Sequence, residues 1–98
     1  MLSFLYSILI SYVGYTWIKS NVECKSDDLR LGTYSSLAAC ATACRNKWPC
    51  KFFIYGKNNK NWNCYWEGTS GASCPEGWEN DSYDFFKLEE GKFPFNDY

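Results

Sequence analysis

Six cysteines are the residues of this sequence whose type and spacing most plainly suggest chemistry. They lie at positions 24, 40, 44, 50, 64 and 74 of a 98-residue chain. Cysteines at this density can form disulfides, bind a metal ion or carry out redox reactions. Each of these roles would place the protein in a different functional class.

Structural disulfides fit the pattern better than zinc binding or redox catalysis does. A zinc site made by four cysteines is possible in principle, but the chain has no histidine and no CxxC pair. The CxxxC spacing of Cys40 and Cys44 is not the usual redox motif, and both residues fall inside a predicted helix rather than at its N-terminus. An even number of cysteines in so short a chain predicts a disulfide framework, with no metal and no cofactor.

A helix and several strands are needed to position these cysteines. The segment 36–48 is predicted to be helical, with Ser35 or Ser36 as its N-cap and Pro49 as its end. One stripe of this helix is expected to face the core, because its members recur at helical spacing: Leu37, Cys40, Ala41, Cys44 and Trp48. Cys40 and Cys44 therefore leave the same face of the helix.

The remaining pattern predicts a small antiparallel sheet. Residues 51–56 and 62–68 are expected to form a hairpin around a polar turn, with Phe52 and Ile54 on one face and Phe53 and Tyr55 on the other. Further strands are expected over residues 83–88 and, at an edge, over residues 30–34. The predicted fold class is α+β, with one helix packed on the sheet.

The amino terminus, residues 1–18, contains no charged side chain and is almost wholly apolar. Such a start is typical of a cleaved signal peptide, but no Lys or Arg precedes the apolar run. A retained transmembrane or signal-anchor helix is the preferred interpretation, with Tyr15 and Trp17 at the membrane interface and Lys19 just beyond. Small residues spaced by four would let another membrane helix pack closely: Ser3, Ser7 and Ser11.

The chain then divides into four parts. The helix of residues 1–18 is followed by a linker (19–23), a disulfide domain (24–88) and a C-terminal tail (89–98). Either interpretation of the amino terminus places the cysteines in an oxidising, non-cytosolic compartment: the cell surface or secretory pathway, an organelle lumen or an intermembrane space.

The segment 24–88 resembles a PAN/apple domain. The resemblance rests on a helix with CxxxC, a cysteine that opens a strand of CxFxY type, and a cysteine in the return strand. The matching residues are Cys40, Cys44, Cys50, Phe52, Ile54, Tyr55 and Cys64. The resemblance implies the pairs Cys44–Cys50, Cys40–Cys64 and Cys24–Cys74, whereas six cysteines alone allow 15 connectivities.

PAN/apple domains are non-catalytic modules that bind proteins or carbohydrates, so the resemblance implies a binding function. The absence of histidine agrees with a protein that is not an enzyme. The net charge of −1 gives no reason to expect nucleic acid as a partner. We expect a membrane-anchored protein-interaction module, a small accessory subunit of a larger membrane assembly. The alternative is a secreted carbohydrate-binding module whose amino terminus is cleaved.

Aromatic side chains are the candidates for a ligand or partner surface. Four of them surround the second hairpin strand, namely Trp62, Tyr65, Trp66 and Trp78, and three lie in the tail, namely Phe93, Phe95 and Tyr98. For any single one of the first four, a place in the core is the better expectation. Asn80 begins an Asn-Asp-Ser glycosylation sequon.

Overall fold

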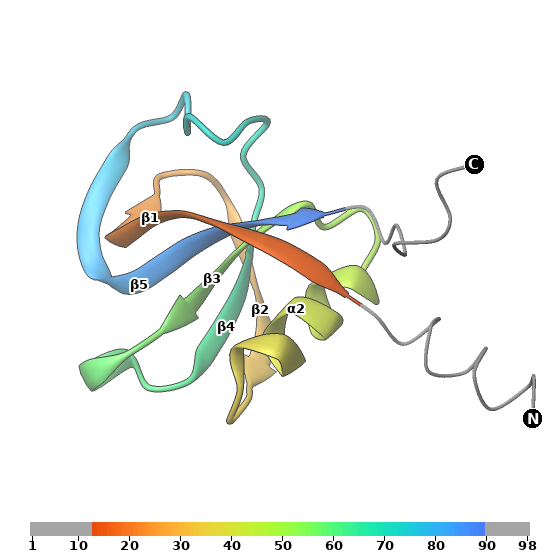
Figure 1. Ribbon diagram of the computed structural model, residues 1–98. Helices are drawn as coiled ribbons and strands as arrows, with labels where there is room; N and C mark the ends of the chain where they lie inside the picture. Colours follow the sequence, from red (N-terminus) through yellow and green to blue (C-terminus); the bar gives the residue numbers. More distant parts are fainter. Residues whose placement is uncertain (1–12, 90–98) are drawn as a thin grey trace, which may run out of the picture.

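The computed structural model describes residues 13–89, which form one helix packed on a five-stranded antiparallel sheet (Figure 1). The predicted α+β class is therefore confirmed. The strand order is β1-β5-β3-β4-β2. The elements in chain order are β1 (Gly14–Cys24), β2 (Asp28–Thr33), α2 (Leu37–Arg45), β3 (Phe52–Gly56), the 3₁₀ turn η1 (Asn58–Lys60), β4 (Asn63–Glu67) and β5 (Trp78–Glu89).

Helix α2 begins as the sequence predicts but ends earlier. The Ser36 side chain accepts a hydrogen bond from the Ala39 backbone N–H at 3.1 Å, which makes Ser36 the N-cap. The helix ends at Arg45, so the prediction that it reaches Trp48 is wrong, and Trp48 is 87% exposed instead of facing the core. The Cys44–Cys50 disulfide joins Cα atoms 5.3 Å apart, so the chain must reverse its direction between these two residues.

The alternation of β3 separates two hydrophobic clusters, one on each face of the sheet. Phe53 packs on the helix face, where its ring stacks on that of Phe86 at 5.2 Å. Phe52 lies on the opposite face, stacked on Phe85 at 5.7 Å. The predicted faces of this strand are thus confirmed, and both faces are covered because the chain supplies apolar side chains to each.

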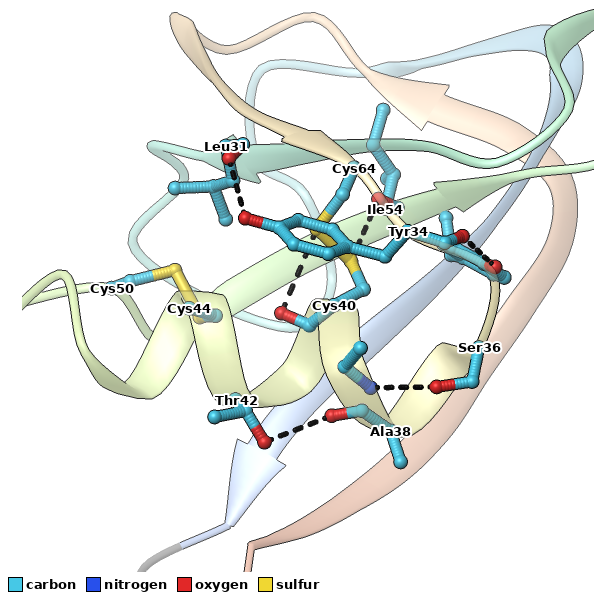
Figure 2. Close-up of a disulfide and its surroundings, with 12 residues drawn as sticks. Leu31, Tyr34, Ser36, Ala38, Cys40, Thr42, Cys44, Cys50, Ile54 and Cys64 are labelled. Carbon is cyan, nitrogen blue, oxygen red and sulfur yellow. Dashed lines mark hydrogen bonds between the residues drawn. A yellow bond between two sulfur atoms is a disulfide. The ribbon is translucent and has the colours of Figure 1, made fainter.

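Three disulfides use all six cysteines: Cys24–Cys74, Cys40–Cys64 and Cys44–Cys50. These are the pairs that the resemblance implied. The Cys40–Cys64 bridge links the buried face of α2 to β4, and both residues are fully buried (Figure 2). Three intramolecular disulfides indicate an oxidising, non-cytosolic compartment.

Strand β1 corrects the prediction for the amino-terminal half. Residues 14–18, assigned to a membrane helix, and residues 19–23, assigned to a linker, lie in this strand and pair with β5. The physical reason is that this segment is rich in β-branched and aromatic residues, which favour extended backbone, and that β5 offers it a full-length partner. Among the described residues, no helix has the length and apolar character needed to span a bilayer.

Strand β5 extends well beyond the predicted 83–88 and forms a long ribbon with β1. The register of this ribbon shifts twice, between Trp17 and Lys19 and between Ser20 and Val22, and Asn21 there has a positive φ of 63°. Such irregularities bend a pair of strands. The ribbon curls in Figure 1. Its curled half carries Val22 and Cys24 onto the hydrophobic cluster of Phe52 and Phe85.

Candidate functional site

The four aromatic residues predicted to surround β4 do not form one surface. Tyr65 and Trp66 are neighbours in this strand and pack against different clusters, one on each face of the sheet. Trp78 packs edge-on against Phe85, with ring centroids 4.9 Å apart. These three side chains are half-buried and pack against the core, and Trp62, at 42% exposure, is the most open of the four.

Trp62 lies at the rim of a surface hollow of about 400 Å³ between the start of α2 and the β3–β4 turn. The hollow lies on the helix face of the sheet, because Phe86 contributes to its floor. Its lining combines aromatic, aliphatic and hydrogen-bonding groups: Ser35, Ser36, Leu37, Tyr55, Gly56, Lys57, Asn61, Trp62, Asp84 and Phe86.

Internal contacts hold the walls of this Trp62 hollow in place. The Lys57 ammonium lies 2.8 Å from an Asp84 carboxylate oxygen, so the two form an ion pair between the turn and β5. The Tyr55 hydroxyl donates to the Tyr34 carbonyl, and burial raises the pKa of Tyr55, which keeps this phenol a neutral donor. A Cβ atom on Gly56 would lie 2.0 Å from the Lys60 carbonyl oxygen, so only glycine allows the turn to close here.

The backbone at Trp62 is itself unusual. Its φ of 83° lies in the left-handed region, which bulky side chains rarely adopt and which costs of the order of 1–3 kcal/mol. The Trp62 carbonyl accepts a hydrogen bond from the Tyr34 N–H at 3.0 Å, which fixes the residue despite this cost. An exposed ring on a strained and anchored backbone is typical of a binding position.

Of the other predicted site residues, Asn80 lies in the part of the chain that the structure describes. Asn80 is exposed in β5, so its side chain is open to solvent. The proposed helix-packing serines, Ser3, Ser7 and Ser11, lie outside the described residues. The tail aromatics, Phe93, Phe95 and Tyr98, also lie outside them.

Several exposed apolar side chains were not predicted as surface. Trp48 is 87% exposed and Trp17 is 58% exposed, and Leu29 and Tyr15 are also open to solvent. Trp17 in β1 and Leu29 in β2 are the two end members of a row of paired residues that crosses all five strands on the helix face. The helix covers the middle of this row and leaves both ends open. Tyr15 and Trp17 were expected at a membrane interface, and no sequence signal separated Trp48 and Leu29 from core residues.

A cluster of acidic residues, called the acidic corner here, was not predicted from the sequence. Its members come from the ends of four strands, namely Glu23, Asp28, Glu67, Glu79 and Asp81. Glu67 is only 1% exposed, and its Oε1 accepts a hydrogen bond from the Ser26 hydroxyl at 3.0 Å. Strand pairing makes neighbours of Asp28 and Glu67 and of Glu23 and Glu79, and the curl of the sheet brings these two pairs together.

Burial and mutual repulsion shift the ionisation of this acidic corner. Burial raises the pKa of Glu67 to about 8, helped by the negative charges of neighbouring carboxylates and opposed by the Ser26 hydrogen bond. Burial also raises the pKa of Glu23 to about 7, together with its hydrogen bond to Asp81. The same hydrogen bond lowers the pKa of Asp81, so a proton shared by this pair resides more readily on Glu23 than on Asp81.

Comparison with known proteins adds no functional assignment. No family model matches the chain, and neither a curated protein nor a solved structure does. The function therefore has to be argued from the geometry of the Trp62 hollow and of the acidic corner.

Proposed function

We propose that this chain is a non-enzymatic, disulfide-stabilised binding module that acts outside the cytosol and binds a carbohydrate in the Trp62 hollow. The observation that carries the proposal is an exposed tryptophan ring beside a shallow hollow lined by hydroxyl, amide, ammonium and carboxylate groups. The apolar face of a sugar ring packs on an aromatic ring, while its hydroxyls need donors and acceptors nearby.

The polar lining suits a neutral sugar better than a charged one. Lys57 and Asp84 neutralise each other, so the hollow carries no net charge from this pair. Asn61 is exposed, and its amide can both donate to and accept from a hydroxyl. Ser35 and Ser36 also line the hollow.

The resemblance to PAN/apple domains supports the same class of function. That resemblance implied a helix with two bridged cysteines and a binding function without catalysis. In this chain the Cys40–Cys64 bridge fixes α2 to the sheet next to the hollow, since α2 begins at the hollow's rim. A rigid rim lowers the entropy that ligand binding must overcome.

The test is binding of the native, disulfide-bonded protein to a broad array of neutral and acidic oligosaccharides. We expect binding to at least one neutral glycan, and a loss of at least tenfold in affinity for Trp62→Ala. Trp48→Ala is the matched control, because Trp48 is the more exposed tryptophan but does not line the Trp62 hollow. No binding across the array, or equal losses in the two variants, would refute the proposal.

A second candidate is a protein-interaction module, and the edge of the sheet favours it. Among residues 13–89, β1 is an edge strand: it pairs with β5 on one side and with no strand on the other. It also exposes the large rings of Tyr15 and Trp17. A partner strand can add to such an edge, with the aromatic rings as anchors. In this candidate the chain is a membrane-associated accessory subunit, in which Ser3, Ser7 and Ser11 contact a neighbouring membrane helix.

Co-purification from solubilised membranes separates this candidate from the first. Trp17→Ser should reduce recovery of a partner protein, and leucine at the three serine positions should do the same. Trp48→Ser is the control for loss of an exposed ring elsewhere. Unchanged recovery in both sets of variants would rule out the accessory subunit.

A further inference from the structure

The acidic corner lies where the two edges of the sheet approach each other. β1 and β2 are the outermost strands, yet Glu23 at the end of β1 and Asp28 at the start of β2 lie close to Glu67 in β4. One carboxylate oxygen from each of these three residues lies within 4.8 Å of the other two. The sheet curls enough to bring its two edge strands to one point.

Like charges also face each other directly across the strands. Glu23 is paired with Glu79 in the β1–β5 register, and Asp28 is paired with Glu67 in the β2–β4 register. Directly opposed like charges destabilise a sheet. Among the described residues, the charged groups that act on Glu67 are all negative, namely Asp28, Glu23 and Glu79.

A separate observation concerns the buried carboxylate itself. Glu67 is only 1% exposed, and although its Oε1 is bonded to Ser26, its Oε2 is buried without any hydrogen-bond partner among the described residues. A buried polar atom without a partner costs about 1–3 kcal/mol, and more when it is charged. The orphaned oxygen belongs to one of the three clustered carboxylates, so a cation held between them would satisfy it.

We propose that Glu23, Asp28 and Glu67 bind one calcium ion. The donors are oxygens only, which favours a hard cation over zinc or copper. Calcium accepts six to eight oxygen ligands in irregular geometry, and the exposed side of Asp28 leaves room for water ligands. Magnesium fits less well, since it requires near-ideal octahedral geometry.

The compartment indicated by the disulfides agrees with this ion. Calcium sites of extracellular modules typically have dissociation constants of about 10⁻⁴–10⁻³ M. Three carboxyl groups with a partly open coordination sphere suit that range, because calcium must displace the protons of the carboxyl groups that it binds. The proposal is independent of the ligand in the Trp62 hollow, because none of these carboxylates lines that hollow.

The test is calorimetric titration of the full, native chain with CaCl₂, together with thermal unfolding in EDTA and in about 5 mM CaCl₂. We expect one site, a dissociation constant below about 1 mM and an unfolding temperature raised by about 5 °C or more in calcium. Binding should fall at least tenfold in Glu67→Gln and in Asp28→Asn. Glu89→Gln, at the far end of β5, should bind as the wild type does.

Asp28 is exposed, so Asp28→Asn keeps the test valid even where Glu67→Gln alters folding. No heat of binding and no thermal shift up to about 10 mM calcium would overturn the proposal. Full binding by both site variants would overturn it as well. Tighter binding of magnesium than of calcium would reject calcium as the ion.

Discussion

The ionisation of Glu67 gives a direct test of the electrostatics of the acidic corner. Its pKa is about 8 in the folded protein, against 4.5 for an ordinary glutamate. Between these two pH values the folded chain therefore holds a proton that the unfolded chain has lost. The free energy of unfolding falls as pH rises through this window, and the contribution is fully present only below about pH 4.5.

The magnitude follows from the distance between these two pKa values. A pKa difference of one corresponds to about 1.4 kcal/mol, so the rise from 4.5 to about 8 corresponds to about 5 kcal/mol. Carboxylates nearby can reorient as Glu67 ionises, so we expect a loss of about 3–5 kcal/mol between about pH 4.5 and pH 9. Glu67→Gln keeps the shape and the Ser26 contact but has no proton to lose.

The assay is urea unfolding of the disulfide-bonded protein at about pH 4.5, 7 and 9, in EDTA. The wild type should lose about 3 kcal/mol or more relative to Glu67→Gln across this range, and the variant should be the more stable protein at pH 9. The variant should keep a smaller slope up to about pH 7, which is due to Glu23. Parallel curves for the two proteins would show that Glu67 is not held in its neutral form and would refute the reasoning.

Three further predictions concern the scaffold and the hollow. Replacing Cys40 and Cys64 together by alanine removes a bridge that spans 24 residues and should cost about 3 kcal/mol, measured by urea unfolding; an unchanged unfolding midpoint would contradict this role of the bridge. Gly56→Ala would place a methyl group on the Lys60 carbonyl oxygen, so it should cost at least about 2 kcal/mol and shift the amide NMR signals of the turn; a neutral result would contradict so close a contact between the two residues. Trp62→Gly should be more stable than Trp62→Ala by about 1 kcal/mol, since glycine adopts a φ of 83° without strain; equal stabilities would contradict the strain.

The part of the fold that could be predicted from the sequence is the part built from local patterns. The cap at Ser36, the stripe of Cys40 and Cys44 and the alternation in β3 each depend on residues within a few positions of one another. The return strand was also predicted to within one residue at each end, since residues 62–68 were expected and β4 spans Asn63–Glu67.

The long strands were missed because their signals are ambiguous. Residues 14–18 continue an apolar run that begins near residue 2, so they suggested a membrane helix although β5 pairs with them. The first half of β5, residues 79–82, is wholly polar and shows no alternation of apolar residues. Its strand conformation follows from pairing with β1, which is tertiary information.

The candidate sites also combine features that the sequence predicts with features that depend on the tertiary fold. Trp62 was predicted as one of four aromatic candidates, but its exposure and its hollow required the packing of α2 and β5 around it. The carboxylates of the acidic corner lie 5 and 39 residues apart along the chain at positions 23, 28 and 67. No motif links them, since the pairing of β2 with β4 and the curl of the sheet make them neighbours.

The pairing of the first and last described strands has a consequence for biosynthesis. β1 bonds to β5 over residue pairs separated by 54 positions at Cys24–Trp78 and by 75 positions at Gly14–Glu89. The sheet therefore lacks its edge strand until almost all of the described chain has left the ribosome. Bringing two such distant strands together costs loop-closure entropy before their contacts form, so folding is slow. The aromatic surface of β1 stays exposed during that time. β1 is therefore the first described strand to be synthesised, and it can pair only when the last described strand has emerged.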